Sequence, residues 1–198
     1  MGGIMTAEAP SHPTWPVPPE GGYTVDDLFN LPDLPPHTEL IDGSLVFVSP
    51  QRDFHSLVID MLVHGLRRTV PEQYRVRREM AVVIDRKQGP EPDVSVVRTE
   101  AVTGPDVTSY RAADVLLAVE VMSPDSEKRD RERKPQLYAA AGIRHFWRVE
   151  SDNGRPVVYV YELDTATRTY VPTGIYHDQL KLKHPFTIDI DLTEIDKL

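Results

Sequence analysis

A stripe of apolar residues at helical spacing runs through residues 53–71, with polar positions on the opposite side. This pattern predicts an amphipathic helix with one buried face, capped by Asp53 and ended before Pro71. A shorter helix is expected within residues 23–33, with Thr24 as its N-cap. The members of the longer stripe are Phe54, Leu57, Val58, Met61, Leu62, Gly65 and Leu66.

Other apolar segments have the length of strands and are bounded by turn residues. Asp42-Gly43 between two apolar runs is a strong hairpin signal. Residues 115–122 are so continuously apolar that a strand buried on both faces is expected. The segments predicted to form strands are 39–50, 74–85, 92–97, 115–122, 143–150, 156–163, 168–174 and 185–192.

The remaining segments complete the expected fold. Residues 98–113 are polar and predict a loop, whereas residues 126–141 return to a helical period and end at Gly142 as a C-cap. This order of elements predicts an α/β (α+β) domain with a mixed central β-sheet flanked by helices and a C-terminal strand meander. We expect one domain over residues 23–198, preceded by a disordered, proline-rich tail over residues 1–22.

The composition narrows the possible functions. The chain of 198 residues has no cysteine, which excludes disulfides, thiolate metal sites and cysteine nucleophiles. No apolar run could span a bilayer and no secretory signal is present, so a cytoplasmic protein is expected. The net charge of −9 opposes nucleic-acid binding, which would need local basic side chains or a metal ion that screens the acids. The candidate basic contacts are Arg67, Arg68, Arg75, Arg77 and Arg78.

Two carboxylates lie in segments that are predicted to be buried strands. Asp93 stands at the start of the apolar run 92–97, and Glu120 lies inside the run 115–122. A buried carboxylate is costly unless it is paired, hydrogen-bonded, protonated or bound to a metal. If the strands are neighbours, the two side chains converge, and with Glu39 they offer the oxygen ligands that Mg²⁺ or Mn²⁺ prefers. A structural pairing of Glu120 with an arginine stays open as the alternative.

The charged run 125–134 contains five basic and four acidic side chains and has the pattern of a solvated helix face. On such a face Asp130 would pair with Lys134. Lys134 also stands one helical turn before Tyr138, so it could point across the sheet toward Glu120. There its ammonium group could orient a water molecule or offset charge on a phosphate.

His55 opens the long predicted helix, and two roles stay open for it. It could contact a phosphate or a metal-bound water, or it could cap the helix or pack quietly against it. Two carboxylates acting as acid and base would also suit a hydrolase that needs no metal, which is a further alternative for the chain.

The order of these motifs resembles the Uma-two family of restriction-endonuclease-like proteins, which belongs to the PD-(D/E)xK nuclease superfamily. The resemblance covers about residues 23–165, and it lies in the order and spacing of the motifs taken together. The matching stretches are 39-ELIDG-43, 55-HSLV-58, Pro92-Asp93, 119-VEVMSPDS-126, Asp130, Lys134 and 138-YAAAGIRHFWRV-149.

The resemblance implies a restriction-endonuclease-like fold and a set of site residues. It assigns the first metal-binding acid to Asp93 and the second to Glu120, with Glu39 as a further ligand. The lysine expected two residues after the glutamate is replaced by Met122, and Lys134 on the following helix takes its place.

The implied activity is that of a Mg²⁺-dependent (or Mn²⁺-dependent) endonuclease that hydrolyses phosphodiester bonds of DNA. The alternative is a catalytically weak or inactive relative that binds nucleic acid or a protein partner. Restriction-like nucleases often act as dimers, so a homodimer is possible. Three aromatic residues of the last strands, expected to be exposed, are candidates for its interface, and the alternative is that they are ordinary sheet residues: Tyr159, Tyr161 and Tyr170.

Overall fold

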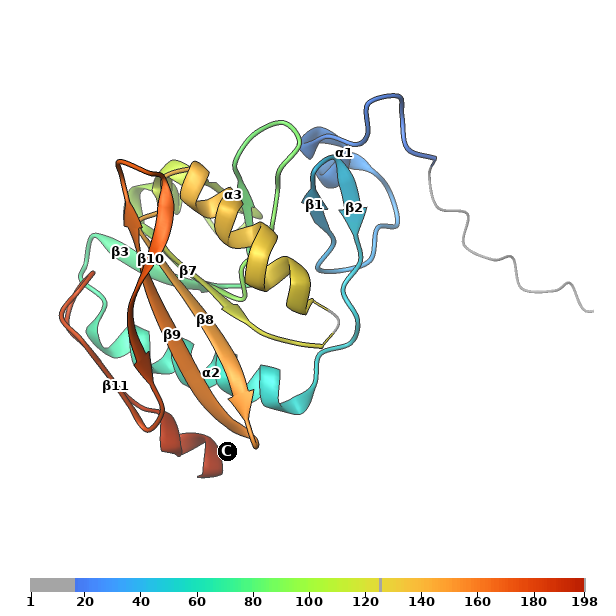
Figure 1. The fold of residues 1–198 in the computed structure, drawn as a ribbon. Coiled ribbons are helices and arrows are strands. Elements are labelled where there is room, and N and C mark those ends of the chain that lie inside the picture. The colour runs from blue at the N-terminus through green and yellow to red at the C-terminus, as the bar shows by residue number, and fades with distance from the viewer. Residues whose placement is uncertain (1–16, 125, 198) are drawn as a thin grey trace, which may run out of the picture.

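The centre of the computed structural model, which describes residues 17–124 and 126–197, is a six-stranded mixed sheet in the order β10-β9-β8-β7-β5-β3 (Figure 1). Neighbouring strands are antiparallel except β7 and β8, which are parallel. The predicted mixed sheet and its C-terminal meander β8-β9-β10 are therefore confirmed. The strands are β3 (Tyr74–Arg78), β5 (Val94–Arg98), β7 (Val115–Val121), β8 (His145–Asp152), β9 (Arg155–Asp164) and β10 (Thr169–Tyr176).

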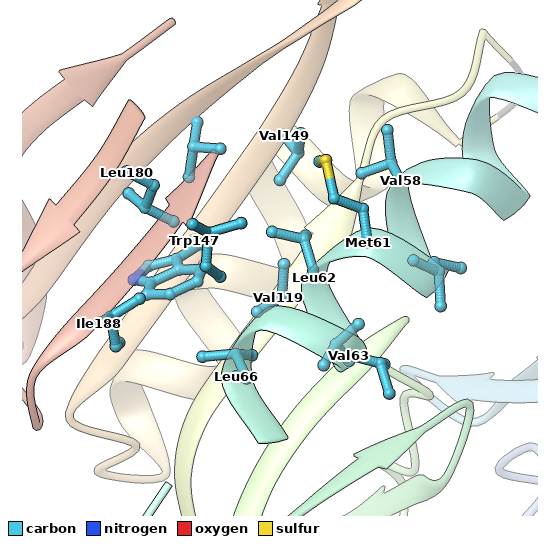
Figure 2. Packing of buried hydrophobic residues seen from close by; sticks show 14 of the residues in the cluster. Val58, Met61, Leu62, Val63, Leu66, Val119, Trp147, Val149, Leu180 and Ile188 are labelled. Atoms are coloured by element: carbon cyan, nitrogen blue, oxygen red, sulfur yellow. The ribbon is translucent and has the colours of Figure 1, made fainter. Parts of the chain in front are cut away.

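Helix α2 (Asp53–Thr69) covers one face of the sheet with the predicted apolar stripe. A two-stranded sheet of β11 (Gln179–Leu182) and β12 (Ile188–Asp191) packs beside it and extends the same core. Figure 2 shows this packing around Trp147. The cluster includes Val58, Leu62 and Leu66 of α2, Val119 and Trp147 of the central sheet, and Leu180 and Ile188 of the second sheet.

Helix α3 (Lys134–Ala140) lies over the other face of the sheet, where a second core cluster forms (Figure 1). Alternation along β7 sends Val119 to the α2 side and Ala118 to the α3 side. Tyr138 of α3 and Phe146 of β8 belong to the same second cluster as Ala118. The sheet is thus buried on both faces, as the continuous apolar run of β7 predicted.

Short elements complete the fold around the sheet. Hairpin β1–β2 turns at Asp42 and Gly43, both with positive φ, as the sequence predicted. Residues 98–113 were predicted to be a loop, and this was wrong, because they contain β6, which pairs in parallel with β4. Residues 74–85 form two strands instead of one. The elements are α1 (Val25–Asn30), β1 (Glu39–Ile41), β2 (Ser44–Val46), β4 (Ala81–Val83), β6 (Ser109–Arg111), and 3₁₀ helices at Thr99–Ala101, Ala112–Asp114 and Leu192–Lys197.

The two helix caps predicted from the sequence have different outcomes. Thr24 caps α1 in a capping box with Asp27, as predicted. Asp53 does not cap α2, since it is the first helical residue and the N-cap position is Arg52, which makes no side-chain capping bond. Asp53 instead lies in the first turn, where a negative charge is favourable.

The helix expected over residues 126–141 contains a π-helical turn, Arg129–Arg133, directly before α3. The backbone N–H of Lys134 donates to the carbonyl of Arg129, which is the five-residue spacing of a π-turn. Such a turn adds one residue and rotates the side chains before it relative to α3. Gly142 follows the helix with φ of 85°, the left-handed conformation expected after a helix end.

The expected tail over residues 1–22 falls mainly on residues outside those described. In the described part, the ammonium group of Lys87 donates to the carbonyl oxygens of Gly21, Gly22 and Tyr23. Among the described residues, no helix has both the length and the apolar character needed to cross a membrane.

Close packing of α2 against β12 depends on Gly65. A methyl group at this position would lie 2.6 Å from Cδ1 of Ile190, well inside van der Waals contact. We expect Gly65→Ala to lower the free energy of unfolding by about 1–2 kcal/mol, because overpacking costs about 1–3 kcal/mol and better helix propensity returns up to about 1 kcal/mol. Urea denaturation measures this change. Gly104→Ala is the control, since no atom lies within 4 Å of its added methyl. Equal stability of the two variants would contradict the prediction.

Candidate active site

A cavity of about 270 Å³ opens where the N-terminal ends of α2 and the π-turn meet the end of β7. The start of β1 and the segment 47–52 between β2 and α2 contribute further walls. Carboxylates dominate its charged lining, and the permanent cations are fewer. The carboxylates are Glu39, Glu79, Glu91, Asp93, Glu120 and Asp130, and the permanent cations are Arg52, Arg129 and Lys134.

Asp93 and Glu120 are brought together by the pairing of β5 with β7. Val94, which follows Asp93, lies opposite Val119 in the antiparallel ladder, so the two acids stand at the same end of neighbouring strands. Oδ2 of Asp93 accepts a hydrogen bond of 2.6 Å from the backbone N–H of Val121. The strands are therefore neighbours, which is the condition under which the sequence predicted that these carboxylates converge.

Lys134 lies among three carboxylates. Its Nζ is 2.7 Å from Oε1 of Glu39, 2.9 Å from Oε2 of Glu120 and 3.2 Å from Oδ1 of Asp130. The Lys134 side chain is only 5% exposed. Lys134 thus points toward Glu120 as its spacing suggested, and its partner is a carboxylate cluster. The predicted pairing of Asp130 with Lys134 is present, but the prediction of a solvated face was wrong for Asp130, because the π-turn carries it inward.

Tyr138 completes the environment of Glu120. Its hydroxyl donates a hydrogen bond of 2.6 Å to Oε1 of Glu120, while Lys134 holds the other carboxylate oxygen. The sequence contained the signal for this contact, since Tyr138 follows Lys134 by four residues and shares its helix face. Met122 occupies the usual lysine position, and its backbone N–H donates to the carbonyl of Val149 in the parallel ladder.

Burial or neighbouring charges raise the pKa of Glu120, Lys134 and Tyr138. Burial raises the pKa of Glu120 well above its ordinary value, and Lys134 offsets part of this shift. Burial alone would lower the pKa of Lys134, but Asp130, Glu120 and Glu39 raise it well above its ordinary value. Burial and the nearby Glu120 also raise the pKa of Tyr138. Lys134 therefore remains an ammonium ion and Tyr138 a neutral hydrogen-bond donor.

His55 and His37 stand beside the acids at the cavity wall. Nε2 of His55 lies 3.1 Å from Oδ1 of Asp93. Burial alone would lower the pKa of His55, but contact with Asp93 raises it above the ordinary value. Nδ1 of His37 is 2.6 Å from Oε1 of Glu91, whose backbone N–H donates to Glu39. The contact of His55 with Asp93 favours a role in the site over a purely structural packing role. The pair of His37 and Glu91 was not predicted from the sequence.

Arg129 is a further residue of the cavity that the sequence did not single out. It begins the π-turn, and its side chain lines the cavity beside the carboxylates. Its Nε is buried and has no hydrogen-bond partner among the described residues. Because Nε–H is a hydrogen-bond donor, it could donate to an anion that enters the cavity.

The donor set suits a hard divalent cation. Its ligand atoms are carboxylate oxygens, and their charge exceeds that of the cations around them. In the arrangement shown, no three His, Asp or Glu side chains of the described residues converge as in a metal site, because Lys134 stands among the carboxylates. Asp93, Glu120 and Glu39 are the residues that would hold the ion.

The other candidates from the sequence do not line the cavity. Arg68, Arg75 and Arg77 hydrogen-bond to backbone carbonyls, and Arg78 pairs with Asp60 and with Glu79 of the cavity wall. Tyr159, Tyr161 and Tyr170 were expected to be exposed, and this was wrong, since all three are half-buried. Two of them, Tyr161 and Tyr170, pack against Phe146 of the second core cluster.

Comparisons with known proteins agree with the fold. The family model Uma2, described as "Putative restriction endonuclease", matches residues 25–193. The fold is similar to a crystal structure of a "putative nuclease belonging to DUF820" from Anabaena variabilis, with a TM-score of 0.66 and 17% sequence identity. That similarity covers 88% of this chain and 97% of the other. No curated protein matches the chain. Because the family model spans most of the sequence, the chain belongs to the Uma2 family of restriction-endonuclease-like proteins.

Proposed function

We propose that the protein is a metal-dependent endonuclease that hydrolyses phosphodiester bonds of DNA, with Mg²⁺ or Mn²⁺ as its cofactor. The observation that carries the proposal is a cavity lined by Asp93, Glu120 and Glu39, in which the buried Lys134 pairs with Glu120 and Glu39. Membership of a nuclease-like family and similarity to a nuclease fold support the same activity. Cutting both strands of a duplex requires two such sites, so the proposal includes a homodimer.

Each side chain of the cluster has a distinct part in this proposal. Lys134 and Tyr138 fix the two oxygens of Glu120, so the carboxylate cannot rotate freely. Val121 N–H and His55 hold the two oxygens of Asp93 in the same way. Carboxylates that are hydrogen-bonded to neighbouring groups of the protein keep their positions during the reaction. A divalent ion bound to these carboxylates would supply an activated water and neutralise charge on the phosphate.

Arg129 is the residue that we assign to the substrate phosphate. The scissile phosphodiester is an anion, and the rest of the cavity is mainly acidic. A guanidinium with an unpaired buried nitrogen offers a charge-assisted hydrogen bond to a non-bridging phosphate oxygen. The arginine would therefore hold the substrate against a repulsive lining.

We expect Arg129→Met to lower kcat/KM for DNA cleavage roughly 10- to 100-fold, as for the loss of a charged hydrogen bond of about 1.5–3 kcal/mol. Stability should stay within about 0.5 kcal/mol of wild type, since Nε has no hydrogen-bond partner within residues 17–124 and 126–197. Initial rates on supercoiled plasmid and urea denaturation measure the two quantities. Arg144→Met removes the same charge from an exposed position and serves as the control. An equal loss of activity in both variants would exclude this role for Arg129.

The experiment that tests the function combines cleavage with metal binding. Purified protein is incubated with supercoiled plasmid in Mg²⁺, in Mn²⁺ and in EDTA, and nicked and linear products are measured over time. Calorimetric titration with Mn²⁺ runs in parallel. The proposal expects cleavage only with metal and one binding event per chain. Absence of both cleavage and Mn²⁺ binding overturns the proposal, and cleavage that continues in EDTA favours a hydrolase that uses two carboxylates without metal.

One observation favours the alternative of an inactive relative that binds nucleic acid or a protein partner. The ammonium group of Lys134 already contacts Glu39, Glu120 and Asp130, so part of the acidic charge is balanced within the protein. In such a relative the cluster would be structural. Mn²⁺ binding separates the two functions, because a structural cluster closed by Lys134 does not take up the ion.

A further inference from the structure

A second cavity, of about 380 Å³, lies on the other side of the helix that carries Lys134. It opens between this helix and strands β8, β9 and β10. Arg131, Pro135 and Ala139 line it at four-residue spacing, whereas Asp130, Lys134 and Tyr138 form the adjacent stripe toward the acidic cluster. The helix therefore separates two cavities. We call this second one the aromatic cavity.

Three aromatic rings form the floor of the aromatic cavity. Phe146 is buried, and its ring centroid lies 5.7 Å from that of Tyr161 and 5.3 Å from that of Tyr170. The planes of Phe146 and Tyr170 are inclined by 25°, close to a stacked arrangement. Both tyrosines are half-buried and line the cavity. Ring surface is therefore available to a planar group that enters the cavity.

Arginines surround this floor. Cζ of Arg148 lies 4.7 Å from the ring centroid of Tyr159 and 5.5 Å from that of Tyr161. Oε1 of Glu150 is 2.7 Å from Nε of Arg148 and 3.0 Å from a terminal nitrogen of Arg131, so one carboxylate orients two guanidinium groups. Arg168 lines the cavity as well.

The charge of this lining is opposite to that of the whole protein. Arg131, Arg148 and Arg168 line the aromatic cavity together with Glu132, while Glu150 pairs with two of these arginines and the chain carries a net charge of −9. A local excess of fixed guanidinium groups selects an anion, and the adjacent aromatic rings select a planar apolar surface. Few common ligands combine an anionic group with a planar ring. A nucleotide does, because its phosphate and its base belong to one small molecule.

We infer that the aromatic cavity binds one unpaired nucleotide, with its base against Tyr161 and Tyr170 and its phosphate against Arg148 and Arg131. Base stacking on aromatic side chains combined with arginine contacts to the backbone is a general mode of single-strand recognition. The inference goes beyond the proposed cleavage, because it concerns a different cavity and holds for a free nucleotide or for one in a strand.

The test uses the full chain in EDTA, so that cleavage plays no part. Amide chemical shifts are recorded during titration with 5′-dAMP, and fluorescence anisotropy follows a labelled single-stranded oligonucleotide. The variants are Arg148→Met and Tyr161→Leu. Arg155→Met is the matched control, since it removes the same charge from an exposed position that pairs with Asp196.

We expect the two cavity variants to weaken binding roughly 5- to 100-fold and the control to stay within about twofold. Shifts with 5′-dAMP at Tyr161 and Tyr170 support capture of a free nucleotide, and binding of the oligonucleotide alone supports a nucleotide within a strand. No binding of either probe by wild type overturns the inference, as does equal weakening by Arg155→Met.

The test of nucleotide binding can be separated from the test of the proposed cleavage. Asp93 lies in the cavity around Glu120, so Asp93→Asn should keep nucleotide binding while it loses cleavage. Arg148→Met should lose nucleotide binding and keep wild-type affinity for Mn²⁺. This result would assign nucleotide binding to the aromatic cavity and metal binding to the cavity that contains Asp93.

Discussion

Lys134→Met is expected to lower the free energy of unfolding by about 3–5 kcal/mol, which is the typical cost of removing one partner from a buried ion pair. The loss is large because Nζ of Lys134 contacts Glu39, Glu120 and Asp130, and all three are buried. Without the ammonium group these carboxylates must remain charged and unpaired, or take up protons. Methionine keeps most of the side-chain volume, so the effect is mainly electrostatic.

Urea denaturation at neutral pH measures this change. Lys181→Met is the control, because Lys181 is exposed and its Nζ lies 3.6 Å from Asp189 at the surface. Should Lys134→Met fail to fold, the double variant Lys134→Met/Glu120→Gln removes charge of both signs and should recover part of the stability. A loss no larger than that of Lys181→Met, or no recovery in the double variant, would show that the cluster is not held by this lysine.

Much of the sheet could be predicted from the sequence, because its signals are local. The apolar run of β7, the stripe of α2 and the turn at Asp42-Gly43 each follow from periodicity or turn chemistry. Strand β6 was missed because Ser109–Arg111 carries no apolar period and is fixed by its pairing with β4, more than twenty residues away in the chain. Such pairing is a tertiary effect that outweighs local propensity.

The site was predictable to a different degree for each residue. Asp93 and Glu120 could be singled out as candidates because carboxylates stand out in apolar runs, and Lys134 because of its spacing from Tyr138 and the family resemblance. The burial of Asp130 was not foreseen, since a charged run has the same pattern whether its helix faces solvent or the sheet. The π-turn explains this failure: its extra residue changes which side chains of 125–134 point inward, and no residue type marks it.

The two cavities differ in the charge of their linings, which the net charge of the chain does not reveal. The acidic lining around Glu120 accounts for part of the −9, and it is consistent with a cation bound there. The arginines of the aromatic cavity lie on the other side of α3, where they are close in space although Arg131, Arg148 and Arg168 are far apart in sequence. A chain can therefore be acidic overall and still present a basic site to an anion.

Asp93→Asn is expected to lower the rate of metal-dependent cleavage roughly 10²- to 10⁴-fold, as for a loss of about 3–5 kcal/mol of transition-state stabilisation. Asparagine keeps an oxygen that can accept from the backbone N–H of Val121, so the fold around β7 is maintained. What is lost is the negative charge that would bind the cation and that raises the pKa of His55.

Single-turnover rates on plasmid and Mn²⁺ calorimetry measure this loss, and both should fall together. Asp60→Asn is the matched control: Asp60 lies on α2 with a side chain 59% exposed, where it pairs with Arg78. The control should keep wild-type rate and affinity, because its charge is screened by solvent and lies outside the cavity lining. If Asp93→Asn cleaved DNA and bound Mn²⁺ like Asp60→Asn, Asp93 would be a structural acceptor for Val121, and the activity would have to reside elsewhere in the chain.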